Sequence, residues 1–179
     1  MSQQYPPPQQ PAGGNPFGQQ APFQPAPPAP PAPRTGNVAL AVLVGLVAMI
    51  VGAAAYGGLM RAFADDEGGY TEIGYVAVGV GALVGFAVGK LGGRNPVLPI
   101  VSAVLAVAGV YMGQIFGLCL VASHFFEAQF GADLSWTEFV THEELNAFDV
   151  WSEDSAPMAF LFLAIGGFVG FSSAKKAGG

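Results

Sequence analysis

Residues 38–60 read VALAVLVGLVAMIVGAAAYGGLM, a run without a single charged side chain. A helix needs about 20 consecutive apolar residues to cross the hydrocarbon core of a bilayer, and this run is long enough. Three further runs lack Asp, Glu, Lys, Arg and His: residues 73–89, 97–123 and 156–174. None shows the separate polar face that a surface helix of a soluble protein carries. The sequence therefore predicts an all-α membrane protein with a four-transmembrane-helix bundle.

Composition supports this class and argues against several others. Of the 179 residues, 52% are hydrophobic and only 10% are charged, which leaves long stretches free of charge. The net charge of −6 argues against a nucleic-acid partner, which would itself be anionic. No phosphate loop, nucleophile elbow or dinucleotide fingerprint occurs, so we expect no enzyme, no catalytic residue and no cofactor. The single cysteine, Cys119, lies in the third apolar run, where we expect it to pack without a disulfide.

The first 36 residues differ from the rest. They consist mainly of Pro, Gln, Ala and Gly and carry no charge before Arg34. Such a segment cannot bury enough apolar surface to become ordered, so we expect a disordered Pro/Gln-rich tail with polyproline II character. It would serve either as a solubilising tail or as an arm for a cytoplasmic partner that reads proline-rich peptides. Composition alone favours the first reading. Residues 37–175 form the predicted membrane domain.

The basic residues predict the orientation. With four crossings, five of the six fall on one side of the membrane: Arg34, Lys90, Arg94, Lys175 and Lys176. Lys and Arg near helix ends stay on the cytoplasmic side. Both termini are therefore predicted to be cytoplasmic, in a multi-pass protein of the cell membrane. Arg61 and all of the acidic residues fall on the outer side.

The outer segment 124–155 is predicted to be a folded cap. Ser135 with Glu138, and Thr141 with Glu144, have capping-box spacing, which predicts two short amphipathic helices. Aromatic rings alternate with acidic groups along the segment, as is typical of chain that lies at headgroup depth on the surface of a bundle. These rings belong to Phe125, Phe126, Phe130, Trp136, Phe139, Phe148 and Trp151.

Glycines recur at four-residue spacing in three of the apolar runs. They are Gly81, Gly85 and Gly89 in the second, Gly109, Gly113 and Gly117 in the third, and Gly166 and Gly170 in the fourth. Small residues at this spacing let transmembrane helices approach closely. We expect the second and third helices to meet at such a glycine seam. In the alternative, the seams join copies of the chain in a homo-oligomer or line a pathway.

Glu72 stands immediately before the second apolar run. A carboxylate at the start of a helix is stabilised by the helix dipole, and this explanation needs no function. An acid at membrane depth is also a candidate for contact with an ion or a proton. Gln114 is the only other strongly polar side chain well inside a run, so Glu72 lacks an ionisable relay partner.

The outer segment contains histidine and acidic residues, which are common metal ligands, but their spacing matches no metal-binding motif. The metalloprotease motif needs two histidines four residues apart with a Glu between them, and this spacing does not occur. We therefore predict no metal site. The residues concerned are His124, Glu127, His142, Glu143 and Glu144.

Residues 70–93 read YTEIGYVAVGVGALVGFAVGKLGG. This stretch resembles a block in a family of uncharacterised bacterial multi-pass membrane proteins, in which an E-I-G-Y core opens a glycine-rich second helix. Residues 104–117 look like the helix that follows it, and residues 148–149 look like the lead-in to the last helix. The resemblance implies no activity. The Pro/Gln-rich start of the chain looks like those of actinobacterial membrane proteins, which implies a bacterial inner membrane. Many members resemble zinc-ribbon fusions, whereas this chain has no cysteine before Cys119.

Together these features favour a non-enzymatic integral membrane protein, a scaffold or an accessory subunit of a membrane assembly. Its expected partners are membrane lipid, other membrane proteins or further copies of the chain, and a cytoplasmic partner of the tail. The alternative is a small channel or transporter component formed by oligomerisation, with Glu72 at its outer mouth. The lack of a second ionisable group inside the predicted helices makes this alternative the weaker one.

Overall fold

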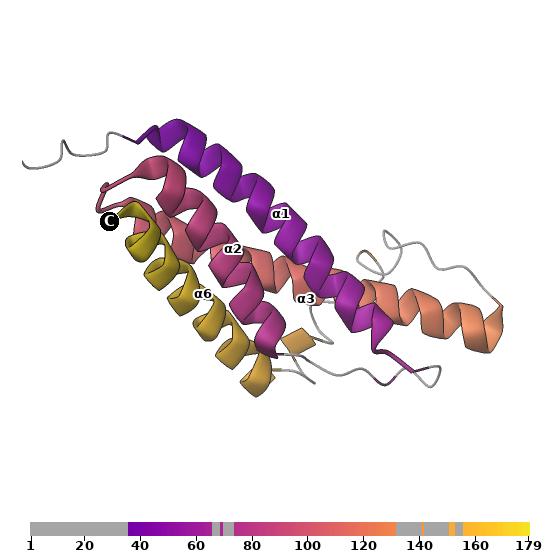
Figure 1. Ribbon diagram of the computed structural model, residues 1–179. Coiled ribbons are helices and arrows are strands. Elements are labelled where there is room, and N and C mark those ends of the chain that lie inside the picture. Colours follow the sequence, from indigo (N-terminus) through magenta and orange to yellow (C-terminus); the bar gives the residue numbers. More distant parts are fainter. Residues whose placement is uncertain (1–35, 66–68, 70–73, 132–140, 142–150, 153–155) are drawn as a thin grey trace, which may run out of the picture. The chain divides into compact units, whose positions relative to one another are not determined.

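The computed structural model describes residues 36–65, 69, 74–131, 141, 151–152 and 156–179. Four long helices account for most of these residues (Figure 1): α1 Val38–Ala62, α2 Gly74–Gly92, α3 Leu98–Phe130 and α6 Ala156–Gly178. All four are long and apolar enough to cross a membrane. Among the described residues, the predicted all-helical fold and its four helices of membrane-spanning length and composition are confirmed, and these lengths indicate a multi-pass membrane protein.

Two predictions fall on other parts of the chain. The Pro/Gln-rich tail, apart from Gly36, lies outside the described residues. So do the short helices predicted in the outer segment, except for single helical positions such as Thr141 and Trp151. The predictions for both segments therefore stay predictions.

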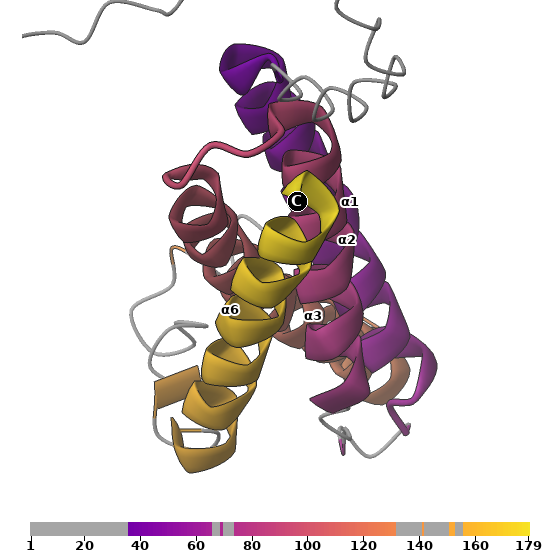
Figure 2. The ribbon, with the colours of Figure 1, turned by 60° about the vertical axis from the view of Figure 1, so that its left-hand side comes forward.

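The helices pack around a central pair. α2 and α3 contact each other, and each of them contacts both α1 and α6, whereas α1 and α6 do not touch. Figure 2 shows α2 between α1 and α6. Buried side chains in this interior include Tyr56 of α1, Val84 of α2 and Val110 of α3. The outer faces carry exposed apolar side chains such as Phe168, as expected of helices that face lipid.

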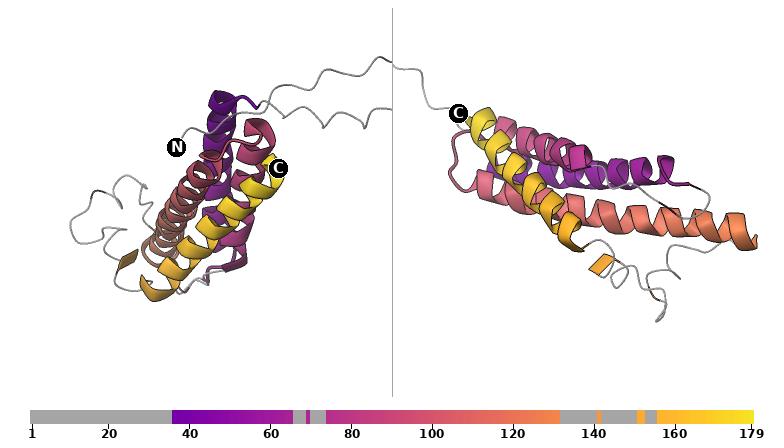
Figure 3. Two further views of the ribbon diagram at one scale, coloured as in Figure 1. Left: turned by 90° about the vertical axis from the view of Figure 1, so that its left-hand side faces the viewer. Right: turned by 90° about the horizontal axis from the view of Figure 1, so that it is seen from below.

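One end of the bundle gathers the start of α1, the end of α2, the start of α3 and the end of α6 (Figure 3). The Asn37 backbone N–H donates to the Leu91 carbonyl at 3.0 Å, which ties α1 to α2. The Asn37 side chain also caps α1 by accepting from the Leu40 N–H at 3.0 Å. α2 ends at Gly92, and the next residue, Gly93, has a φ of 63° in the left-handed region that glycine adopts easily.

α3 is longer than the sequence predicts. Its 33 residues make a helix of about 50 Å, whereas the hydrocarbon core is about 30 Å thick. The helix continues past Ser123 to Phe130 and ends at Gly131, a left-handed cap with φ of 62°. The predicted end at residue 123 is therefore too early. An apolar run stops at the first ionisable residue, here His124, but a helix that has left the hydrocarbon no longer needs apolar residues.

Candidate functional site

The glycines of α2 pack against α6. A Cβ placed on Gly81 or Gly85 would collide with the carbonyl oxygen of Gly166 or Gly170, one turn apart on α6. A Cβ on Gly89 would collide with the carbonyl oxygen of Ala174, one further turn along. The two backbones are therefore in direct contact over more than two helical turns.

The glycines of α3 pack mainly against α1. A Cβ on Gly113 would lie 2.6 Å from Cβ of Tyr56, and one on Gly117 would lie 2.5 Å from the sulfur of Met60. A Cβ on Gly109 would meet Met49 of α1 at 3.1 Å and Val80 of α2 at 3.2 Å.

The expectation of a glycine seam between α2 and α3 is therefore wrong. Two separate seams exist instead, one between α2 and α6 and one between α1 and α3. Four-residue spacing identifies a smooth helix face but says nothing about which neighbour covers it. The short α2–α3 connection made these two helices the obvious pair. They do pack together, but largely through side chains such as Val80.

The polar side chains of Ser102 and Gln114, both on α3, are buried between the helices. The Ser102 hydroxyl donates to the Gly170 carbonyl of α6 at 3.0 Å. This bond lies on the part of α6 where Gly170 also packs against α2. A single residue of α6 therefore holds α2 through close backbone contact and α3 through a hydrogen bond.

Gln114 also makes a polar contact in the interior. Its Oε1 accepts from the indole Nε1–H of Trp151 at 2.8 Å. The Trp151 ring also packs edge-on against Tyr111 of α3, with centroids 5.1 Å apart, and against Phe160 of α6 at 5.4 Å. Trp151, which precedes α6 in the chain, therefore packs between α3 and α6.

The outer segment that contains Trp151 was expected to lie on the outer surface of the bundle, with its aromatic rings at headgroup depth. The structure instead buries the Trp151 ring in the bundle, with 8% of the side chain exposed. The hydrogen bond to Gln114 explains why the ring is buried. The indole N–H can only donate, and with an acceptor inside the bundle it no longer needs water at the interface.

The amide nitrogen Nε2 of Gln114 is buried and has no hydrogen-bond partner within the described residues. Rotating the amide by 180° would not help, because Nε2 would then face the indole N–H, and both groups are donors. The orientation of Gln114 is therefore fixed by Trp151. A buried donor without an acceptor lowers stability by about 1–3 kcal/mol.

The remaining histidine and acidic residues that the sequence singled out lie near the end of α3 or outside the described residues. Glu72, His142, Glu143 and Glu144 lie outside the described residues, and His124 and Glu127 lie on the last turns of α3. Within the part of the chain that the structure describes, no group of three or more His, Cys, Asp or Glu side chains could hold a metal ion. Cys119 is buried and unpaired with any other cysteine.

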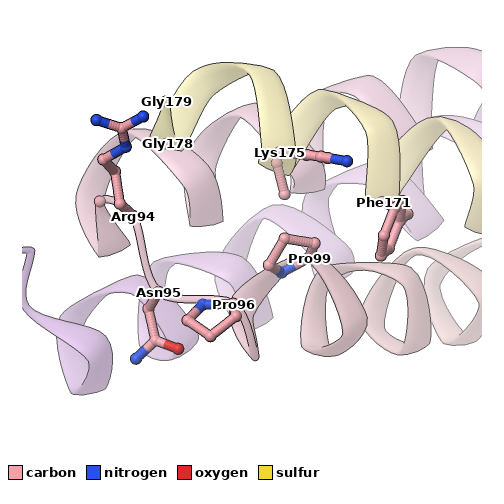
Figure 4. Close-up of a pocket in the computed structure, with 10 residues that line it drawn as sticks. Arg94, Asn95, Pro96, Pro99, Phe171, Lys175, Gly178 and Gly179 are labelled. Carbon is pink, nitrogen blue, oxygen red and sulfur yellow. The ribbon is translucent and has the colours of Figure 1, made fainter.

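Basic side chains collect at the end of the bundle where α2 and α6 finish and α3 begins. Lys90, Arg94, Lys175 and Lys176 belong to this end, and all four side chains are exposed. A cavity of about 400 Å³ opens here between the start of α3 and the end of α6 (Figure 4). Arg94 and Lys175 are among its lining residues.

No protein-family model matches the chain, and neither a curated protein nor a solved structure gives a match. The resemblance of residues 70–93 to the uncharacterised bacterial family therefore stays a prediction. Function has to be argued from the two seams, the buried polar contacts and the ends of the bundle.

Proposed function

We propose that this chain is a non-enzymatic scaffold or accessory subunit of a membrane assembly. In this proposal the bundle is a rigid anchor, and the partner binds the part of α3 that projects beyond the membrane. Both termini lie in the cytoplasm, so the projection lies on the outer side.

The rigidity of the bundle supports this role. The glycine seams bring backbones into direct contact, and the hydroxyl of Ser102 bonds one helix to another. Close-packed interiors have few alternative arrangements, and sliding of α2 along α6 would drive glycine Cα atoms past carbonyl oxygens. These contacts suit an element that holds position, rather than one that alternates between two packings.

The observation that carries the proposal is the projecting end of α3. Its orange end extends beyond the other helices in Figure 3. Phe125, Phe126 and Phe130 form an aromatic cluster there, with ring centroids 5.6–6.4 Å apart. Phe130 is 68% exposed. Phe125 and Phe126 are partly exposed beside it. An exposed aromatic ring supported by neighbouring rings, on a helix outside the hydrocarbon, is typical of a protein-binding surface.

The orientation rests on charge. The four described lysine and arginine residues at one end are Lys90, Arg94, Lys175 and Lys176, and Arg61 is the one described basic residue at the opposite end. Because basic residues near helix ends stay in the cytoplasm, the basic end is assigned to the cytoplasmic leaflet. The projecting end of α3 then faces outward.

Site-specific photocrosslinking in intact cells tests this proposal. A photoreactive amino acid at position 130 is expected to give one discrete adduct, and Phe126→Ser in the same chain should abolish it. The matched control is the same probe at position 168, on an exposed phenylalanine of the lipid-facing side of α6. The mass of the adduct distinguishes a second copy of the chain from another protein. Equal crosslinking at both positions, or none at 130, would overturn the proposal.

A further inference from the structure

The cavity at the basic end combines cationic, polar and apolar walls. Arg94, Asn95 and Pro96 come from the α2–α3 connection, Pro99 comes from the start of α3, and Phe171 and Lys175 come from α6 (Figure 4). Its volume of about 400 Å³ falls within the usual range of about 300–1,000 Å³ for small-molecule sites. It would hold a phosphate group with its glycerol rather than a whole lipid.

The two cationic side chains of the cavity have no acidic side chain beside them among the described residues. Neither Arg94 nor Lys175 forms an ion pair with any described residue. The structure describes two acidic residues, and both lie at the opposite end of the bundle. Asp65 follows α1, and Glu127 lies near the end of α3. Lys90 and Lys176 add to the positive field at this end. An anion entering the cavity would therefore meet two positive side chains from two different elements, at an end of the bundle where no described acidic side chain lies.

The backbone at the start of α3 does not supply the binding groups. The Val97 N–H donates to Oδ1 of Asn95 at 3.0 Å, and the Leu98 N–H donates to the Asn95 carbonyl at 3.3 Å. Pro96 and Pro99 have no N–H, and they stiffen this wall of the cavity. An anion must therefore be held by the side chains of Arg94 and Lys175.

The cationic wall of the cavity lies at headgroup depth and its apolar wall lies nearer the hydrocarbon, as the phosphate and acyl chains of a phospholipid do. The membrane span of α6 has 22 residues, or about 33 Å, so its last turn reaches headgroup depth in a bilayer with a core of about 30 Å. Lys175 lies on that turn. Phe171 lies one turn deeper, toward the hydrocarbon, and is 38% exposed. A phosphate would sit beside Arg94 and Lys175, with its acyl chains passing Phe171.

We propose that this cavity binds the headgroup of an anionic phospholipid from the leaflet at this end of the bundle. Basic pockets between transmembrane helices are suited to such headgroups. The apolar wall at Phe171 distinguishes the lipid from free phosphate, which would use only the cationic wall. This inference is independent of the partner proposed at the far end of α3, because lipid occupancy and crosslinking at position 130 are measured separately.

Native mass spectrometry of the full chain, with phosphatidylglycerol or phosphatidylcholine added, tests the inference. The double variant Arg94→Gln/Lys175→Gln is expected to lose phosphatidylglycerol occupancy by about tenfold or more. The matched control is Lys90→Gln/Lys176→Gln, which removes the same charge from the same end but leaves the cavity lining intact. It should change occupancy less than about threefold, since only screened surface charge is lost.

A second pair of variants separates lipid from free anion. Phe171→Ser should weaken phosphatidylglycerol binding, whereas Phe168→Ser, on an exposed ring one turn away that does not line the cavity, should not. Inorganic phosphate at millimolar concentration should not displace the lipid. Equal loss in both charge variants, equal binding of both lipids, or displacement by phosphate would overturn the inference. All of the substituted side chains are exposed or partly exposed, and thermal unfolding verifies that each variant is folded.

Discussion

The indole N–H of Trp151 donates a 2.8 Å hydrogen bond to the amide oxygen of Gln114 inside the bundle. This bond joins the chain before α6 to the middle of a membrane-spanning helix. It also fixes the orientation of an amide whose nitrogen has no acceptor among the described residues. Loss of the Trp151 indole should therefore lower the stability of the bundle more than loss of the Gln114 amide.

Trp151→Phe should lower the free energy of unfolding by about 1–3 kcal/mol, because it leaves both polar atoms of the Gln114 amide buried without a partner. Gln114→Leu should be milder, since it also removes the unpaired Nε2. The double variant should be more stable than the sum of the single effects predicts. Denaturant unfolding in bicelles measures the cycle. Additive effects would show that the two side chains are not coupled.

Gly85→Ala should destabilise the bundle by about 1–3 kcal/mol, because overpacking forces the backbones apart. Its Cβ would meet the Gly170 carbonyl oxygen and lie 2.7 Å from Cβ of Ser173. Gly79→Ala is the matched control on the same helix, where a Cβ would meet no atom within 4 Å. It should be neutral or slightly stabilising. The midpoint of thermal unfolding in detergent compares the two, and equal shifts would contradict the α2–α6 seam.

Ser102→Ala should cost about 0.5–1.5 kcal/mol, the range of hydrogen bonds between membrane helices. Ser172→Ala is the control, because this hydroxyl donates only within α6, to the Phe168 carbonyl at 2.8 Å and the Val169 carbonyl at 3.2 Å. Such local bonds add little to stability. Denaturant unfolding measures the free energy of unfolding of both variants. A larger loss for Ser172→Ala would mean that the Ser102 bond does not hold α3 to α6.

Cys119 should resist small membrane-permeable thiol reagents in the folded protein, because its side chain is only 3% exposed. Its labelling rate should rise together with global unfolding. The comparison is Cys119→Ser/Met112→Cys, which places the single thiol on a side chain of α3 that is 53% exposed. This thiol should react readily in the native state. Rapid native labelling of Cys119 would show that α3 is not packed as described.

The four helices could be predicted because each contains a charge-free run whose length falls within the range of about 17 residues or more that a membrane-spanning helix needs. The same signal fails at the end of α3, where Phe125, Phe126 and Phe130 continue the helix around Glu127. Hydropathy measures compatibility with hydrocarbon, not helix length. Turn and cap chemistry at Gly131 was the available clue, since glycine is the usual residue at a left-handed helix end.

The partners across the interior could not be predicted. Gln114 stood out as a polar residue in an apolar run, but nothing in the sequence pairs it with Trp151, 37 positions away. Ser102 gave no signal, because serine is tolerated in membrane helices without an interhelical bond. The glycine spacing identified faces that allow close approach, yet the partners of those faces depend on the order of helices around the α2–α3 pair.

The absence of contact between α1 and α6 bears on how the protein is made. α1, α2 and α3 are synthesised first, and each of them touches the other two. Both of the helices that α6 contacts are therefore synthesised before α6 itself. Biogenesis can proceed as the insertion of a three-helix unit, followed by the docking of one late helix along the open glycine face of α2.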